Sequence, residues 1–247
     1  MQSAARRTLV EARALRKAFG VALVLRDVDL TVHAGEVVAV LGANGAGKST
    51  LLRLLACISR ASAGQLTLFD ADCHPGRPSP DVLGRIGFLG HEPLLYEDLT
   101  PRQNLEVFAR LYGRRDGNAD PDQRARASLA RVGLAQAMER PTRALSRGML
   151  QRLALARATQ HGPELLLLDE PFTALDEAGS ELLAAEIRAR AAAGAAVVLV
   201  THDLARVSAL ADRMVVLAGG RVVADTSPVP ATAELVRDYR RLAGLEA

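Results

Sequence analysis

The sequence predicts an α/β fold built on a mainly parallel β-sheet. Three short apolar runs, at residues 36–41, 165–168 and 196–200, have the length and composition of buried strands. Helical patterns separate these runs along the chain, and each run ends in a glycine or in polar residues. Strands that alternate with helices favour parallel pairing, with helices covering the faces of the sheet.

The N-terminal third is expected to consist mostly of strands and turns. Residues 8–41 alternate between apolar and polar side chains, which is typical of strands. A glycine-rich turn at residues 42–49 leads into residues 51–58, where leucines recur at helical spacing. A surface loop is expected at residues 75–80, and a further short strand at residues 86–89.

The middle of the chain, residues 92–160, changes character and is expected to be helical. Thr100 can cap a helix, Pro101 suits the first helical position, and Gln103 can complete a capping box. Residues 120–123 have the same arrangement for a second helix: Asp120 can cap it, Pro121 suits its first position, and Gln123 can complete a capping box. These helices are therefore expected to form an insert between the two halves of the sheet.

The C-terminal third returns to alternation of strand and helix. A helix fits residues 177–193, between two of the apolar runs. Residues 213–225 are expected to form a hairpin around Gly219 and Gly220. A proline-containing link and a short helix are expected to end the chain.

This pattern predicts a single domain over residues 1–247. Its core is expected to comprise residues 1–90 and 151–225. The helical subdomain is expected at residues 91–150, and a tail at residues 226–247.

The composition narrows the classes of function. The formal net charge is +3, and basic residues are spread along the chain, so no nucleic-acid partner is expected. Cys57 and Cys73 have no metal-site spacing, and a reducing compartment is expected. The longest apolar run, residues 191–200, is shorter than the roughly 20 residues of a membrane-spanning helix. We expect a soluble chain whose membrane role comes through a partner.

A phosphate-binding loop is the most specific motif in the sequence. The pattern GxxxxGK[ST] lies between a predicted strand and a predicted helix, where such a loop belongs. Glycines let the backbone wrap around phosphates, Lys48 offers a positive charge, and the Ser49 hydroxyl can ligate Mg²⁺. The alternative is a glycine-rich turn that matches by chance. The residues expected to bind nucleotide are Gly42, Ala43, Asn44, Gly45, Ala46, Gly47, Lys48, Ser49 and Thr50.

Two carboxylates follow the leucine-rich run. Asp169 and Glu170 stand at the carboxyl end of a predicted buried strand, where ligands bind in open α/β sheets. Asp169 is expected to hold Mg²⁺, and Glu170 to act as the general base on a water molecule. Taken alone, the pair is equally typical of a strand end with solvated acids. Together with the phosphate-binding loop it indicates ATP hydrolysis.

A third motif and its surroundings indicate the family. The segment Leu145-Ser146-Arg147-Gly148-Met149 resembles the LSGGQ signature of ABC (ATP-binding cassette) ATPases. Further matches stand in the same order: an aromatic expected to stack on adenine, a D-loop, and a switch histidine after an apolar strand. The residues concerned are Phe19, Thr173, Ala174, Leu175, Asp176 and His202. Singly, they also fit a buried Phe, a helix cap at Ser146 and a polar strand end.

The resemblance implies a fold and a mechanism. The fold is that of a P-loop NTPase of the RecA-like kind, with an N-terminal antiparallel β subdomain and an inserted helical subdomain. Two such chains, identical or homologous, are expected to close head to tail with ATP between them. Ser146, Gly148 and Asp176 would then face the ATP held by the partner's loop, which agrees with anion binding at helix N-termini.

The sequence departs from the family pattern at three positions. Arg147 and Met149 replace the second glycine and the glutamine of the signature. His91 stands where most relatives have the glutamine of the Q-loop, which touches Mg²⁺ and leads to the membrane subunit. We expect His91 to contribute to the nucleotide site as a nitrogen ligand or through water. The alternative is a loop residue that faces solvent.

The expected function is that of the ATP-hydrolysing subunit of an ABC transporter, peripheral on the cytoplasmic face of the inner membrane and partnered by integral membrane subunits. Residues 90–93 and 145–149 are similar to the ATPases of haem exporters used in cytochrome c maturation. The alternatives are an exporter of drugs, lipids or ions, a soluble ABC protein acting on DNA or ribosomes, and a regulator without turnover. The single cassette disfavours a soluble ABC protein, and Glu170 disfavours a regulator without turnover.

Overall fold

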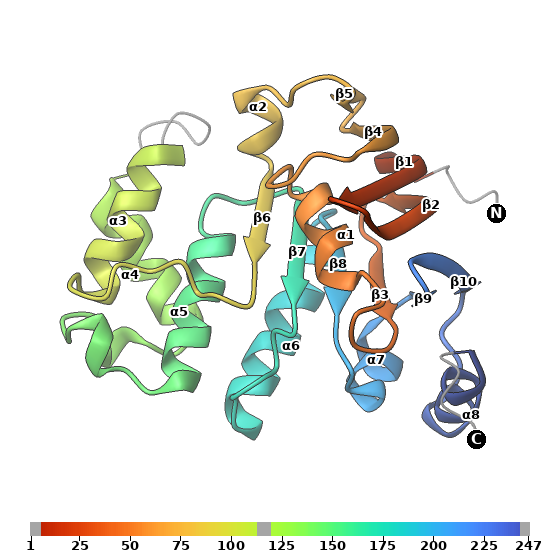
Figure 1. The fold of residues 1–247 in the computed structure, drawn as a ribbon. Helices are drawn as coiled ribbons and strands as arrows, with labels where there is room; N and C mark the ends of the chain where they lie inside the picture. The colour runs from red at the N-terminus through yellow and green to blue at the C-terminus, as the bar shows by residue number, and fades with distance from the viewer. Residues whose placement is uncertain (1–5, 113–119, 243–247) are drawn as a thin grey trace.

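The computed structural model describes residues 6–112 and 120–242, and two β-sheets form in this part of the chain (Figure 1). The larger sheet has six strands in the order β10-β9-β3-β8-β7-β6. Its neighbours pair in parallel except β10, which runs antiparallel to β9. The strands are β3 (Val37–Leu41), β6 (Ile86–Leu89), β7 (Leu165–Asp169), β8 (Ala196–Val200), β9 (Arg213–Ala218) and β10 (Arg221–Thr226). The predicted mainly parallel sheet is confirmed.

The smaller sheet is the antiparallel subdomain that the resemblance implied. Its strand order is β2-β1-β4-β5, and each pair is antiparallel. The strands are β1 (Thr8–Phe19), β2 (Ala22–His33), β4 (Ala63–Leu68) and β5 (Ala71–His74). Together with the six-stranded sheet it encloses the helix α1 (Figure 1).

The helices gather on both faces of the large sheet and at its end (Figure 1). They are α1 (Lys48–Leu55), α2 (Pro80–Leu83), α3 (Pro101–Tyr112), α4 (Pro121–Arg131), α5 (Arg147–Thr159), α6 (Glu177–Ala192), α7 (Leu204–Leu210) and α8 (Thr232–Leu242), with 3-10 turns η1 (Ala135–Ala137) and η2 (Thr142–Ala144). Helix α1 begins three residues before the predicted start because the glycine-rich turn leads into it without a break. None of these described helices is both long and apolar enough to span a membrane.

The central strands bury side chains on both faces. In β7, Leu165 and Leu167 belong to the core beneath the antiparallel sheet, while Leu166 and Leu168 belong to the core beneath the helical subdomain. Successive side chains of a strand point to opposite faces, so a strand covered on both sides must be apolar throughout. This is why the apolar runs lack the alternation of an exposed strand.

The helical subdomain is formed by α3, α4 and α5. The predicted capping box is present: the Thr100 hydroxyl accepts from the Gln103 N–H, and the Gln103 side chain accepts from the Thr100 N–H. Helix α5 runs unbroken through residue 150, where the sequence suggested a boundary. Near the far end of α5, Arg157 donates to the carbonyl of Phe88 in β6 at 2.8 Å. The subdomain is thus tied to the sheet by a continuous helix.

Asn104 holds the loop before α3 in place. Its side chain is fully buried. Its oxygen accepts from the Tyr96 N–H at 2.8 Å, and its amide donates to the carbonyl of Tyr96 at 2.9 Å and to the hydroxyl of Thr142 at 3.1 Å. One side chain therefore joins the loop after β6, helix α3 and the turn before the predicted signature.

We predict that Asn104→Ala lowers the free energy of unfolding by about 2–3 kcal/mol, because it removes the partner of the buried Thr142 hydroxyl and of the part-buried Tyr96 N–H. Urea unfolding followed by circular dichroism measures this change. Gln103→Ala, next to it on the exposed side, is the matched control and should cost no more than about 1 kcal/mol. Equal midpoints for Asn104→Ala and the wild type would contradict this assignment.

Candidate active site

The site lies where neighbouring parallel strands end. Strands β3, β8 and β7 are adjacent and run in the same direction, so their carboxyl ends meet at one edge of the sheet. Residues 42–47 follow β3, Glu170 follows β7, and His202 follows β8 by two residues. An edge of this kind is where ligands bind in open α/β sheets.

The phosphate-binding loop depends on glycine at two positions. At Gly42 a Cβ would stand 2.3 Å from the carbonyl oxygen of Leu217 in β9. At Gly47, which has a φ of 104°, a Cβ would stand 2.6 Å from the side chain of Leu25. Neither position has room for a side chain, so the loop is pressed between β2 and β9. This close fit fixes the course of the backbone into α1.

Lys48 points back into the loop that precedes it. Its ammonium donates to the carbonyl oxygens of Gly42 at 2.8 Å and Ala43 at 3.0 Å. Burial lowers the pKa of Lys48, and the nearby carboxylates of Glu170 and Asp169 partly oppose that shift. The charge that the sequence predicted is therefore held at the centre of the loop.

A groove of about 770 Å³ runs along the loop. The predicted nucleotide ligands Asn44, Gly45, Gly47, Lys48, Ser49 and Thr50 line it, together with Asp169 and Glu170. The structure thus brings the two predicted motifs to one groove. Of the remaining loop residues, Ala46 is buried in the core and Gly42 and Ala43 supply carbonyls to Lys48.

The donors in this groove fit Mg²⁺. Ser49 offers a hydroxyl and Asp169, only 7% exposed at the end of β7, offers a carboxylate. No group of three or more His, Cys, Asp or Glu side chains able to hold a metal occurs in residues 6–112 and 120–242. Mg²⁺ ordinarily keeps several waters and binds through one or two protein ligands plus substrate phosphates. A sparse set of hard oxygen donors is therefore the expected one.

Glu170 and His202 are in direct contact. The Nδ1 atom of His202 lies 3.0 Å from an Oε atom of Glu170. The backbone N–H of Glu170 donates to the carbonyl of Val200 at 2.8 Å, which anchors it to β8. Glu170 has a φ of 49°, an uncommon conformation for a residue other than glycine. The carboxylate is thus held in a strained position next to an imidazole.

His91 shares a second groove with the carboxylates. This groove, of about 850 Å³, is lined by His91, Arg147 and Gln151 as well as by Asp169 and Glu170. Its side chain is exposed, so it is free to reach solvent as well as the groove. The two grooves therefore meet at the carboxylates, and the loop after β6 lies beside the predicted signature.

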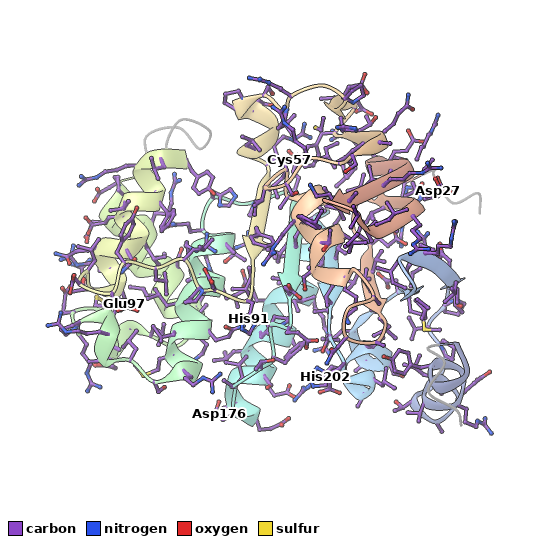
Figure 2. All side chains as sticks on the ribbon, viewed as in Figure 1. Asp27, Cys57, His91, Glu97, Asp176 and His202 are labelled. Atoms are coloured by element: carbon purple, nitrogen blue, oxygen red, sulfur yellow. The ribbon has the colours of Figure 1, made fainter. Side chains whose placement is uncertain are left out.

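The predicted signature and D-loop residues act here as helix caps. The Ser146 hydroxyl accepts from the Met149 N–H at 3.3 Å and caps α5, and a carboxylate oxygen of Asp176 accepts from the Gly179 N–H at 2.8 Å and caps α6. A Cβ at Gly148 would stand 2.9 Å from the carbonyl of Ala174. Ser146 is exposed and does not line the groove of the phosphate-binding loop. Figure 2 shows Asp176 and His202 at the same lower border of the molecule.

The predicted adenine-stacking residue, Phe19, ends β1 with its ring 54% exposed. The ammonium of Lys17 lies 4.7 Å above the ring centroid. Val24 rather than Phe19 lines the groove of the phosphate-binding loop. The ring is exposed enough to stack on a base, and stacking of Phe19 on adenine stays a prediction.

Two contacts beside the site could not be expected from the sequence. Gln151 donates its side-chain N–H to the carbonyl of Pro171 at 3.1 Å, which ties α5 to the segment after Glu170. Tyr239 of α8 packs against the core cluster that contains Leu41 at the end of β3, and burial raises the pKa of its hydroxyl. Both contacts join residues far apart in the chain, which a local motif cannot indicate.

The chain is similar to known proteins. The family model described as ABC transporter matches residues 25–173. The chain is 41% identical over 229 residues to the molybdenum import ATP-binding protein ModC of Mycobacterium tuberculosis (strain H37Rv), covering 89% of this chain but only 61% of that protein. It is 38% identical over 218 residues to the fluoroquinolones export ATP-binding protein Rv2688c of the same strain, covering 88% of this chain and 69% of that protein.

The fold is also similar to that of a solved structure. The dimeric post-hydrolysis ATP-binding cassette MJ0796, bound to ADP and Pi, matches with a TM-score of 0.79 and 26% identity. The match covers 90% of this chain and all of that one.

We predict that Glu170→Gln lowers the rate of ATP hydrolysis by about 10²–10⁴-fold, because the general base is lost while the side-chain size and the contact with His202 remain. ATP affinity should stay near the wild-type value, measured by binding of a fluorescent analogue alongside phosphate release. Lys48→Ala should instead lose both binding and turnover.

The matched control is Glu177→Gln, an exposed residue in the next helix that pairs with Arg206. It should leave the rate unchanged. If Glu170→Gln and Glu177→Gln hydrolyse ATP equally fast, Glu170 is not the base.

Proposed function

This chain belongs to the ABC transporter family, and we propose that it is the ATP-hydrolysing subunit that powers export through separate membrane-spanning partner subunits. Membership makes it an ABC-type ATPase. The observation that carries the proposal is the convergence of Lys48, Asp169, Glu170 and His202 on one strand edge, with the Glu170–His202 contact of 3.0 Å already formed.

The proposed chemistry divides among the chain's own residues. The backbone of residues 42–47 and the Lys48 ammonium bind and orient the phosphates of ATP. Glu170 accepts the proton of the attacking water, and His202, hydrogen-bonded to Glu170, keeps that carboxylate aimed at the site. Ser49 and Asp169 would hold Mg²⁺, which neutralises charge on the phosphates when bound.

A complete site is proposed to need a second chain. Ser146, Gly148 and Asp176 stand outside the groove that holds Lys48, at exposed or half-buried positions. The N-terminus of α5 presents the positive end of a helix dipole, which favours a phosphate. MJ0796 is dimeric. A head-to-tail pair of this chain, or this chain with a homologous ATPase, would place Ser146 against the partner's ATP.

A mixing experiment tests the shared site. Lys48→Ala and Ser146→Asp homodimers should each be inactive. Aspartate caps a helix as well as serine does, so α5 stays folded while the added charge repels phosphate. A mixed dimer carries both defects in one site and none in the other, so about a quarter of the wild-type ATPase rate should return with random exchange in a two-fold pair.

The control for α5 is Ser146→Asn, which retains a helix cap without the negative charge and should keep most of the activity. Full activity in a strictly monomeric Ser146→Asp chain would contradict a shared site.

Membrane subunits are proposed to dock beside the His91 groove. The loop after β6 and the helical subdomain border this groove. Asn104 joins the loop to helix α3, and Arg157 ties α5 to β6. Docking there would connect the membrane subunit to the catalytic carboxylates and place the chain on the cytoplasmic face of the inner membrane.

The transported substrate is proposed to be haem. The support is residues 90–93 and 145–149, which resemble the ATPases of haem exporters in cytochrome c maturation. The two relatives described above are named for molybdenum import and fluoroquinolone export, so another exported substrate is the second candidate. Membrane subunits encoded beside cytochrome-maturation genes would distinguish the two.

We predict that His91→Ala leaves ATP affinity within a few-fold of wild type, because the phosphate-binding loop supplies most phosphate contacts. Stimulation of ATPase activity by the co-purified membrane subunit should fall instead, and His91→Gln should retain it. Both are measured by phosphate release with and without that subunit. An affinity loss as large as that of Lys48→Ala would make His91 a primary phosphate ligand.

A further inference from the structure

The two cysteines meet in the fold although their spacing in the sequence indicated no site. Cys57 follows α1 directly, and Cys73 lies in β5 of the antiparallel sheet. Cys73 belongs to the core between the two sheets, and Cys57 packs against that core. Figure 2 places Cys57 well away from His91 and His202, so this pair is separate from the ATPase site.

The backbone at Cys57 is strained in a way that positions its side chain. Helix α1 ends with the Ile58 N–H bonded to the Arg53 carbonyl and the Cys57 N–H bonded to the Leu54 carbonyl. This is the Schellman pattern, which puts Cys57 at the position usually held by glycine, and its φ is 57°. A thiol therefore occupies a left-handed position that glycine would fill without strain.

The two thiols line the same groove and interact with each other. Each thiol affects the other: Cys57 lowers the pKa of Cys73, and Cys73, together with burial, raises the pKa of Cys57. The Cys73 thiol also donates to the carbonyl of Ala71 at 3.5 Å. The neighbouring backbone at Leu68 also lowers the pKa of Cys73, whereas burial opposes that shift. One sulfur is thus favoured as a nucleophile and the other as the thiol held beside it, an arrangement that suits thiol–disulfide exchange.

A groove leads to the pair. It measures about 630 Å³ and is lined by Cys57, Cys73, Arg60, His74 and Arg77, among others. The guanidinium groups of Arg60 and Arg77 in the same groove favour a small molecule that carries carboxylates. No group of three or more metal-binding side chains occurs in the described parts of the chain, so the groove does not have the ligand set of a metal site.

We propose that Cys57 and Cys73 are a redox-active thiol pair that closes to an intramolecular disulfide on reaction with a small anionic disulfide of the glutathione type. Oxidation of the pair needs no nucleotide, so it can be tested independently of the proposed ATPase and transport functions.

The reaction balances in two exchanges. The Cys73 thiolate attacks one sulfur of the small disulfide, forming a mixed disulfide and releasing one small thiolate. Cys57 loses its proton to solvent and attacks the Cys73 sulfur, forming the Cys57–Cys73 bond and releasing the second thiolate. The protein loses two electrons and two protons, and the small disulfide takes up the electrons to become two thiols.

The bond would tie the end of α1 to β5. Helix α1 begins at the phosphate-binding loop, so the link would join the loop's own helix to the antiparallel sheet. Cross-linked chains lose conformational freedom when unfolded, and the oxidised protein should therefore melt at a higher temperature than the reduced one.

Mass spectrometry of the whole chain tests the proposal. The reduced, desalted protein is incubated with glutathione disulfide, quenched in acid, and alkylated with N-ethylmaleimide in denaturant. We expect reduced protein to take two maleimides. The oxidised protein should take none, weigh two hydrogens less, and yield a linked tryptic pair of residues 54–60 and 61–85 that dithiothreitol separates.

Single variants assign the roles. Cys57→Ser should stop at a mixed disulfide between Cys73 and glutathione. Cys73→Ser should react at least about 10-fold more slowly, because the remaining thiol has the raised pKa and no thiolate beside it. Wild-type protein carrying two glutathione adducts, joining into disulfide-linked dimers, or keeping both thiols would overturn the proposal.

Discussion

The parallel ladder across β3, β8 and β7 is the constraint on which the site depends. Val40 pairs with Val200, and Val200 pairs with Asp169, so backbone hydrogen bonding sets the strand ends in register. All three strands are buried on both faces, which leaves the edge as the place where polar residues can emerge. The phosphate-binding loop, the carboxylates and His202 lie close together because each follows the end of one of these three aligned strands.

Much of this arrangement could be predicted from the sequence because it is local. Apolar runs, the spacing around Lys48 and the capping box at Thr100 are each contained in a few consecutive residues. The Glu170–His202 contact, the burial of Asn104 and the pairing of Cys57 with Cys73 could not be predicted. Each of these contacts joins residues that are far apart in the chain. No pattern of neighbouring residues indicates which distant segments will pack together.

The segment after β7 concentrates backbone strain at the point where two grooves meet. Glu170 and Ala174 both have positive φ, at 49° and 65°. Such conformations cost on the order of 1–3 kcal/mol each and persist only where the surroundings impose them. Here the Val200 carbonyl holds Glu170 and the tip of α5 closes over Ala174 at Gly148. A change at Gly148 therefore has a short route through Ala174 to the backbone of Glu170.

Helix α5 is anchored to the sheet near one end and exposed at the other. Its thirteen residues, Arg147–Thr159, extend about 20 Å at 1.5 Å per residue. Arg157 pins the inner end to the Phe88 carbonyl, whereas Ser146 caps the outer end in solvent. A rotation of roughly 10° about Arg157 would move Ser146, about 16 Å away along the helix, by about 3 Å, which is about the length of a hydrogen bond. A rotation of that size would therefore be enough to make or break a hydrogen bond at the exposed N-terminus of α5.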